Sequence, residues 1–521
     1  MLRRTCPHGP VLLIMSLAPA CGDGGDGDRD PTASPASTST ALPDPTDATT
    51  DATTAAATTD EPTTSPSTTT GEPADCAEVL EQVDLPLAAP YTRELTLPPH
   101  ATCAPVTLES AGPPHILEIS APGAALRVGP DERPDDEPGW QRPREFAGGS
   151  HPVLVDNPGP TPLQISLTIT DRGPSPPPIQ RERSLVWTQP PLVDDPTACK
   201  LACVLSKISA DGHGGPLLRQ WFDRFSTTTH SQRFGPRSLL DEFAAQAGPD
   251  PLQWDLDALP FIVTAVHNRL DLANSEHCGE LRLSFASTHA VFRPFHLIFL
   301  FRQPPVPEDI SPGGALHCNA TAMRWARLGE LPEPEFLAAA QALITEHVTA
   351  AGFLAAESNE FTIAPWEWRQ WFFVDPQTLD NRPLFQSVDI PRLNTPGPER
   401  DAFLAWAEAN AAELSNRRAP IPEEFRAPSA RANQGVPWIP LQLTPALDAA
   451  WPDLRRNLEI VGCPACHATD AEFVQTLPNR TFSPFYDKEL DARAAHFDAL
   501  VRGAASPPPF GPLQPTPLLP P

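Results

Sequence analysis

The chain has 521 residues with 65 acidic and 37 basic side chains, which gives a formal net charge of −28. This excess of negative charge argues against a nucleic-acid-binding protein, because a surface that follows a phosphate backbone needs an excess of Lys and Arg. Proline accounts for 69 of the 521 residues, about 13% against roughly 5% in ordinary proteins, so much of the chain is expected in linkers, turns and sheet edges. No apolar run reaches the ~18 residues of a membrane-spanning helix.

Residues 1–20 have the order of a secretory signal peptide: two arginines, the short apolar stretch Val11–Ala18, and small residues. The following Leu17-Ala18-Pro19-Ala20-Cys21 resembles the lipobox of bacterial lipoproteins, although the Leu lies one position early and Pro19 is unusual. The resemblance implies a lipid on Cys21 and an anchor in the outer membrane, on the periplasmic side or the cell surface. Plain secretion with an incidental cysteine is the alternative.

Residues 21–75 are predicted to be a disordered tether. Between Pro31 and Thr70 the chain consists almost entirely of Thr, Ser, Ala, Pro, Asp and Glu. Such a composition cannot bury enough apolar surface to offset the conformational entropy of folding.

Residues 76–173 show short alternating apolar and polar runs between Pro and Gly turns, which predicts a small all-β sandwich. The runs are Glu94–Leu97, His115–Ile119 and Leu163–Ile169. Cys76 and Cys103 are candidates for a disulfide within it.

Residues 185–450 mix both patterns without a strict alternation of strand and helix, which predicts an α+β domain. Helical spacing is found at Gly215–Phe225, Pro236–Ala247, Pro334–Ala351 and Arg400–Asn416. Strand-like runs are Phe261–Val266, Leu281–Ala286 and Phe295–Phe301. The last run is apolar apart from His296, and this is apolar enough for a central strand that is buried on both sides. The aromatic cluster of Trp366, Trp368, Trp371, Phe372 and Phe373 is interpreted as a core strand or interface rather than a cofactor surface.

Eight cysteines remain when Cys6 of the signal peptide and Cys21 are set aside. Besides Cys76 and Cys103, the candidate disulfide pairs are Cys199 with Cys203 and Cys278 with Cys318, although the sequence does not fix the connectivity. A spacing of four on a helix is awkward for a disulfide, so Cys199 with Cys203 is the less secure pair.

The segment Cys463-Pro464-Ala465-Cys466-His467 has the spacing for covalent attachment of c-type haem. Two thiols at this distance reach the two vinyl groups of one porphyrin, and the adjacent imidazole of His467 becomes the proximal ligand of the iron. Two other interpretations stay open. The CxxC loop could close a disulfide with His467 on the surface, or the pair could bind a metal together with distant ligands.

Residues 451–505 are predicted to be a short, mainly helical module that carries this motif, followed by the Pro-rich tail 506–521. In it, Leu490, Ala494, Phe497 and Val501 mark one face of a helix that resembles the C-terminal helix of cytochromes c. His496 at the flank of this face is the nearest candidate for the sixth ligand. A surface histidine, five-coordinate iron and ligation by Met323 are the alternatives.

Four charged residues lie between apolar runs in the α+β domain: Arg269, Asp271, Glu280 and Arg282. Unpaired charge is costly at such positions. These residues are therefore expected to form a paired structural network, or else a ligand-binding cluster.

Three blocks together resemble a family of uncharacterised secreted lipoproteins of Gram-negative bacteria. They are Leu218–Asp223; Val266–Ala273 with Cys278–Arg282 and Cys318; and Gly462–His467 with Phe473, Pro478, Arg480, Ser483–Phe485, Glu489 and Leu490. The resemblance implies that the α+β domain and the CxxCH segment belong to one unit, but it supplies no reaction.

The sequence therefore predicts a multidomain lipoprotein with a c-type haem that acts in extracytoplasmic electron transfer or redox sensing. Its expected partners are a membrane, through the lipid, and a redox partner protein, with no nucleic acid. The alternative is a non-redox binding or adhesion lipoprotein whose CxxC is a structural disulfide. The motifs GxSxG, HExxH and Walker A are absent from the sequence, which leaves open whether the protein is an enzyme.

Overall fold

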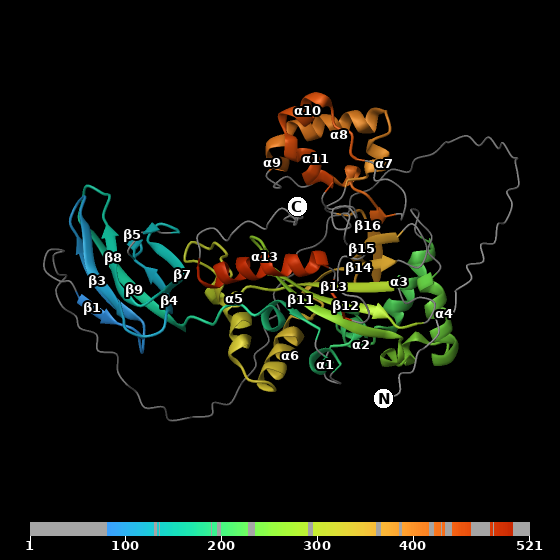
Figure 1. Ribbon diagram of the computed structural model, residues 1–521, viewed down its shortest axis with the longest axis horizontal. Coiled ribbons are helices and arrows are strands. Elements are labelled where there is room, and N and C mark those ends of the chain that lie inside the picture. The colour runs from blue at the N-terminus through green and yellow to red at the C-terminus, as the bar shows by residue number, and fades with distance from the viewer. Residues whose placement is uncertain are drawn as a thin grey trace, which may run out of the picture. The chain divides into compact units, whose positions relative to one another are not determined.

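The computed structural model (Figure 1) describes most of the residues that follow the tether. These residues are 81–129, 133–134, 136–188, 190–194, 199–227, 235–289, 295–360, 366–384, 388–415, 421–428, 430–432, 440–459, 480–482 and 484–503. They all belong to one compact unit, Thr70–Pro521. The predicted signal peptide, tether, CxxCH motif and Pro-rich tail lie outside the described residues. The multidomain α+β architecture is confirmed.

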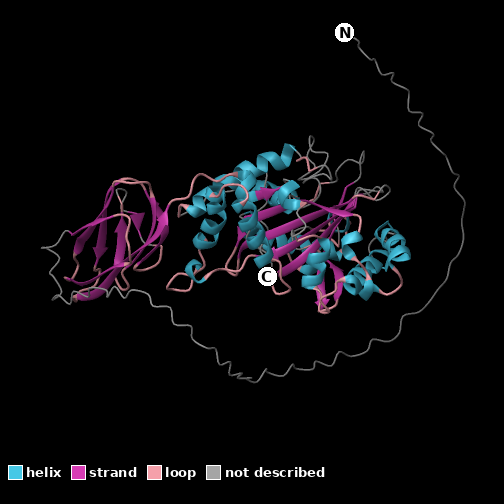
Figure 2. Cartoon of the chain, turned by 90° about the horizontal axis from the view of Figure 1, so that it is seen from below, coloured by secondary structure: helices cyan, strands magenta, loops and turns pink. Residues whose placement is uncertain are grey.

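The first part of the described chain is all-β, as its alternating pattern predicts (Figure 2). Its strands are β1 (Glu81–Asp84), β2 (Tyr91–Leu97), β3 (Thr102–Ser110), β4 (His115–Ser120), β5 (Ala125–Val128), β6 (Arg133–Pro134), β7 (Trp140–Phe146), β8 (Gly149–Asp156) and β9 (Leu163–Pro174). One sheet has the order β1-β3-β8-β5-β6 and the other β2-β9-β4-β7. Both sheets bury alternate residues, among them Val106, Leu117 and Leu167, in one shared apolar core.

The α+β domain is built on an eight-stranded antiparallel sheet with the order β10-β11-β12-β13-β14-β15-β16, in which β17 also pairs with β15. The strands are β10 (Val186–Trp187), β11 (Phe261–Ala273), β12 (Cys278–Ser287), β13 (Phe295–Arg302), β14 (Phe353–Glu360), β15 (Trp366–Asp375), β16 (Thr378–Arg382) and β17 (Ala430–Ala432). β13 lies in the interior of the sheet and is buried except at His296 and Arg302, as predicted for a central strand.

Helices cover both faces of this sheet. They are η1 (Arg181–Leu185), α1 (Pro190–Val193), α2 (Leu201–Ile208), α3 (Gly215–Thr227), α4 (Gly235–Ala247), η2 (Pro251–Gln253), η3 (Leu256–Ala258), η4 (Pro307–Asp309), α5 (Asn319–Ala326), η5 (Arg327–Glu330), α6 (Glu335–His347) and α13 (Pro484–Val501). In Figure 1, α13 lies along one face, whereas α1, α2, α5 and α6 lie against the other. On that other face, the aromatic rings of Trp221 and Phe225 in α3 pack edge-on or tilted against Trp371 of β15. The aromatic cluster thus contributes a core residue, as predicted.

A smaller group of helices has an apolar core of its own. Its elements are α7 (Ile390–Leu393), α8 (Pro398–Ala409), α9 (Ala411–Ser415), η6 (Glu423–Phe425), α10 (Pro445–Ala450) and α11 (Pro452–Glu459). Phe403, Leu414 and Leu454 are buried in this core, which is separate from the core beneath the large sheet. Most of the group lies within residues 185–450, where the sequence predicts a single domain.

The two helical parts of the predicted module 451–505 belong to different cores. Leu454 and Leu458 of α11 lie in the small helical core, while Leu490 and Phe497 of α13 lie in the core of the large sheet domain. The predicted apolar face of α13 is present, but it packs on the α+β domain because this domain offers the apolar surface that it needs. The described helices therefore do not form one separate module.

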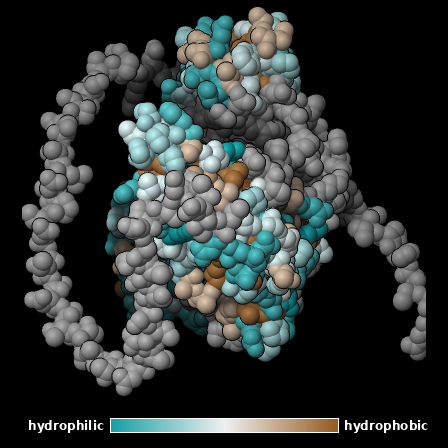
Figure 3. All heavy atoms as spheres, turned by 90° about the vertical axis from the view of Figure 1, so that its left-hand side faces the viewer, coloured by the Kyte–Doolittle hydropathy of each residue, from teal (hydrophilic) through white to brown (hydrophobic). Residues whose placement is uncertain are grey.

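Apolar side chains on the surface are scattered. On the face drawn in Figure 3, the brown hydrophobic areas among the coloured residues are small and separated by hydrophilic ones. The large apolar residues exposed among the described ones are Leu252, Ile310, Val374 and Trp451, which come from different elements. Within the same residues, no helix combines the length and hydrophobicity needed to span a bilayer.

Candidate functional site

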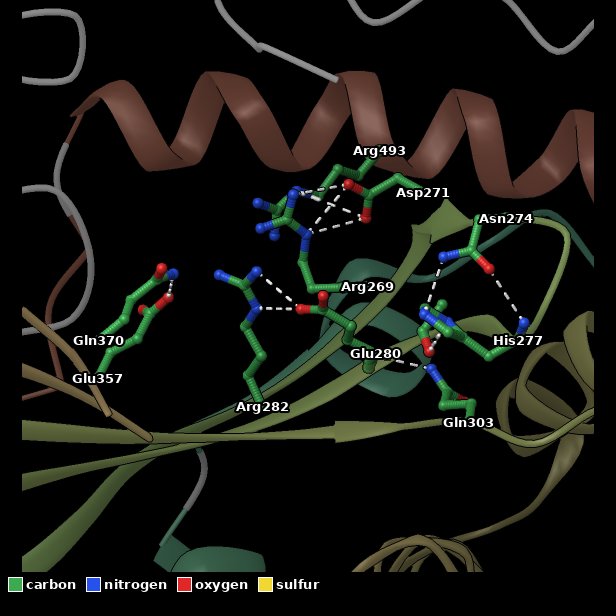
Figure 4. A network of polar contacts seen from close by, with 11 residues as sticks. Arg269, Asp271, Asn274, His277, Glu280, Arg282, Gln303, Glu357, Gln370 and Arg493 are labelled. Atoms are coloured by element: carbon green, nitrogen blue, oxygen red, sulfur yellow. Dashed lines mark hydrogen bonds and ion pairs between the residues drawn. The ribbon is translucent and has the colours of Figure 1, made fainter. Parts of the chain in front are cut away.

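The most chemically distinctive part of the described chain is a group of polar and charged side chains on one face of the large sheet. Residues on β11 and β12 pair as Arg269 with Glu280 and His267 with Arg282. Because side chains alternate between the two faces of a strand, these four and Asp271 all point to the same face. Figure 4 shows this face with α13 passing over it. We call this group, together with Arg493 and Glu357, the charged cluster.

Asp271 is the centre of the charged cluster. Its carboxylate accepts hydrogen bonds from Arg269 Nε at 3.0 Å and Nη2 at 2.7 Å, and Arg493 Nε of α13 lies 3.9 Å from it. Burial alone would raise the pKa of Asp271. The two guanidiniums, the hydrogen bonds from Arg269 and the nearby His496 outweigh burial and lower this pKa from 3.8 to about 2. Asp271 is therefore ionised and joins the sheet to the C-terminal helix.

A second ion pair lies beside the first. Arg282 Nε donates to Glu280 at 2.8 Å, and both side chains keep 15% of their surface exposed. His267 Nε2 lies 3.1 Å from the Ser284 hydroxyl. Burial, and then the positive charges of Arg493, Arg282 and Arg269, hold the pKa of His267 well below 6.5. His267 is therefore neutral.

The third part of the charged cluster is a buried carboxyl on β14. Glu357 accepts a hydrogen bond from Gln370 Nε2 of β15 at 3.2 Å. Burial raises its pKa, and Arg282 and Gln370 offset only part of this effect. Further along the same face, burial lowers the pKa of His296 to about 4. Three guanidiniums and three carboxyls thus lie on one face of the sheet, and burial favours the neutral form of one of these carboxyls, Glu357.

A polar network at the end of β11 holds the charged cluster in place. Gln303 Nε2 donates to Asn268 Oδ1 at 2.8 Å and to the Glu280 carbonyl at 3.0 Å, and its own oxygen accepts from Trp325 Nε1 at 2.6 Å. Next to it, Asn274 Nδ2 lies 2.9 Å from His277 Nε2. These contacts connect strands to α5 and have a structural role.

The disulfide predictions are confirmed where the residues are described. Cys199 is bonded to Cys203 and Cys278 to Cys318, with Cα–Cα distances of 5.1 and 5.3 Å. The spacing of four is accommodated because α2 begins only at Leu201, so that Cys199 precedes the helix. Cys103 is also disulfide-bonded. Its partner lies outside the described residues, since the other described cysteines pair with one another.

The remaining predicted site residues are mostly outside the described part of the chain. This applies to Cys21, Cys76, Cys463, Cys466 and His467. His496 is described: it lies half-buried on α13, close enough to Asp271 to lower the pKa of that carboxyl. Met323, the alternative ligand, lies on α5 in the large core. In the described ranges, no three His, Cys, Asp or Glu side chains are grouped as a metal would need.

The sequence predicts four members of the charged cluster, and these are paired as expected. It missed His267, Glu357 and Arg493. The only signal for Arg493 was its place among the apolar positions of α13, one residue before Ala494. A charged residue within an apolar helix face needs a partner, but nothing in the sequence identified Asp271 as that partner.

The chain matches no protein-family model, and no curated protein is similar to it.

Proposed function

We propose that the protein is an exported lipoprotein with a c-type haem, which acts in electron transfer or redox sensing outside the cytoplasm. The observation that carries this proposal is the spacing Cys463-Pro464-Ala465-Cys466-His467. Cys463 and Cys466 would form the thioether bonds, and His467 would be the proximal ligand. When bound, haem supplies one-electron transfer at its iron.

One structural observation supports the proposal. Disulfides persist in oxidising compartments, where c-type haem is also attached, and two of them are present in the α+β domain.

The described residues would act on the cofactor through position and charge. α13 begins at Pro484, after the CxxCH segment, and is held in the large core by Leu490 and Phe497. Arg480, which precedes α13 in the sequence, forms an ion pair with Asp194 and donates to the Val263 carbonyl at 3.3 Å. These contacts hold Arg480, which follows the CxxCH segment in the sequence, against β11.

The experiment is production of the exported chain together with haem-attachment machinery. We expect a Soret band that survives acid-acetone extraction, and we expect Cys463→Ala/Cys466→Ala to abolish it. His496→Gln serves as the matched axial-ligand variant. A changed spectrum in it supports axial ligation, whereas an unchanged one removes His496 from the proposal and leaves covalent haem standing.

The same experiment decides between haem and the alternative function. Colourless protein in which mass spectrometry finds Cys463 bonded to Cys466 would contradict the haem proposal and support a non-redox binding or adhesion lipoprotein. The anchor is tested separately: Cys21→Ala should release the protein from the membrane fraction, and the wild-type N-terminal peptide should carry a lipid mass. An unmodified N-terminus would contradict the lipoprotein assignment.

A further inference from the structure

The two described disulfides lie in very different surroundings. Cys278 and Cys318 are separated by 40 residues and are only 0% and 2% exposed. Cys199 and Cys203 are separated by 4 residues; Cys199 is 7% exposed, and Cys203 is half-buried. The short-range disulfide is therefore the more accessible of the two.

The short-range disulfide is located at the N-terminus of α2. Cys199 directly precedes the N-cap residue Lys200, and Cys203 is the third residue of the helix. The N-terminus of a helix stabilises a thiolate through its unpaired N–H groups and its dipole. No side chain caps this end, and the first turn contains no acidic residue that would compete with a thiolate. A sulfur released here would be a good leaving group.

Opening this disulfide would leave α2 in place. The helix is held by Leu201, Val204, Leu205 and Ile208, which are all buried in the large core. The bond itself closes a loop of few residues and so contributes less to stability than a long-range disulfide. Reduction is thus compatible with the folded domain.

There is also space next to Cys199. A cavity of about 20 Å³, enough for roughly one water molecule, is lined by Cys199 together with Leu192 of α1 and Ile344 of α6. Two thiols need more room than a bonded pair of sulfurs. The cavity allows the Cys199 side chain to move when the bond opens.

We propose that Cys199–Cys203 is a redox-active disulfide that accepts two electrons from the dithiol of a thiol–disulfide exchange protein. A thiolate of the donor attacks Sγ of Cys203, which breaks the bond to Cys199 and releases the Cys199 thiolate at the N-terminus of α2. The second thiolate of the donor then attacks the mixed disulfide and releases Cys203. The donor ends as a disulfide, and the two protons lost by its thiols are taken up by Cys199 and Cys203.

The test uses the mature full-length chain carrying Cys463→Ala/Cys466→Ala, so that the CxxCH thiols do not contribute. It is incubated without denaturant in thioredoxin or glutathione redox buffers, and free thiols are alkylated and located by mass spectrometry. We expect reversible reduction of Cys199–Cys203 with an unchanged circular dichroism spectrum, at a rate at least about 100-fold above that of Cys278–Cys318. If Cys199–Cys203 is not reduced in this way, the haem proposal is unaffected. If the wild-type protein is colourless, the proposal for Cys199–Cys203 is unaffected.

A second variant tests the role of the helix terminus. Lys200→Glu places a negative charge beside the departing thiolate and should slow exchange by about two- to fivefold, while Lys207→Glu, at the other end of α2, should not slow it. Equal rates for both disulfides, reduction only in denaturant, or loss of the fold on reduction would each overturn the proposal.

Discussion

Asp271→Asn is the most informative single change in the charged cluster. The carboxylate side chain is 3% exposed and is shared between Arg269 and Arg493. Asn has nearly the same shape but no charge, so the variant removes the negative charge that the buried guanidiniums of Arg269 and Arg493 share. We expect this loss to destabilise the contact between β11 and α13.

The size of the effect follows from two independent arguments. Lowering the pKa of Asp271 from 3.8 to about 2 corresponds to about 2 kcal/mol of stability, at about 1.4 kcal/mol per pKa unit. Removal of one partner from a buried ion pair costs about 3–5 kcal/mol. We therefore expect a loss of about 3 kcal/mol at pH 7. Because the folded-state pKa is the lower one, this stabilisation is complete above about pH 5 and is lost as the pH falls toward 2.

The assay is denaturant-dependent hydrogen exchange of the β11 and β12 amides, read by mass spectrometry at pH 7 and pH 3. Asp375→Asn is the matched control, since Asp375 is exposed at the end of β15 and an Asn can still accept from the Gln377 N–H. This control should stay within about 0.5 kcal/mol of wild type. Addition of Arg493→Met to Asp271→Asn should recover part of the loss. The reasoning fails if Asp271→Asn behaves like the control, or if its cost is the same at both pH values.

Three further changes test other buried groups. Glu357→Gln should be as stable as wild type at pH 4 and more stable than wild type at pH 8. The reason is that the pKa of Glu357 is raised in the folded state, so the wild-type protein loses stability as the pH rises above the pKa of this carboxyl in the unfolded chain. A variant that is as stable as wild type at both pH values would contradict this. Glu367→Gln should lower the free energy of unfolding by about 3–5 kcal/mol, because Glu367 and Arg369 form an ion pair whose side chains are 0% and 1% exposed. The double variant Glu367→Leu/Arg369→Met should restore most of this stability. A double variant as unstable as Glu367→Gln would show that packing, not charge, is responsible. Replacement of Cys278 and Cys318 by Ser should lower the stability by about 4 kcal/mol in thermal unfolding, from the loop-entropy relation for a separation of 40; an unchanged melting temperature would argue against it.

The sequence predicts the strands of this protein well where burial imposes a simple pattern. β13 is apolar from Leu297 to Phe301 because both of its faces are covered, and the strands of the sandwich alternate because only one face of each sheet meets the core. The arginines and carboxyls of β11 and β12 are also predictable as a paired network, because isolated charges between apolar runs are too costly to bury.

Partners that come from distant segments could not be predicted. Arg493 contacts Asp271 only because α13 returns to the sheet, and no local pattern encodes that return. Likewise, Glu357 is an ordinary residue in its strand, and its raised pKa comes from burial by the assembled domain. The helical spacing of Arg400–Asn416 predicts α8, but the separate core around Phe403 was missed because its other members come from segments distant in the sequence.

The return of the C-terminal helix also governs when the domain is completed during synthesis. The contact of Arg480 with Val263 spans 217 residues, so β11 is synthesised long before the helix that covers it. Until α13 is made, the ionised side chains and apolar surface of β11 are exposed to water and to proteases. Chains that end before residue 484 never acquire this cover, and we expect them to be degraded faster than the full-length protein.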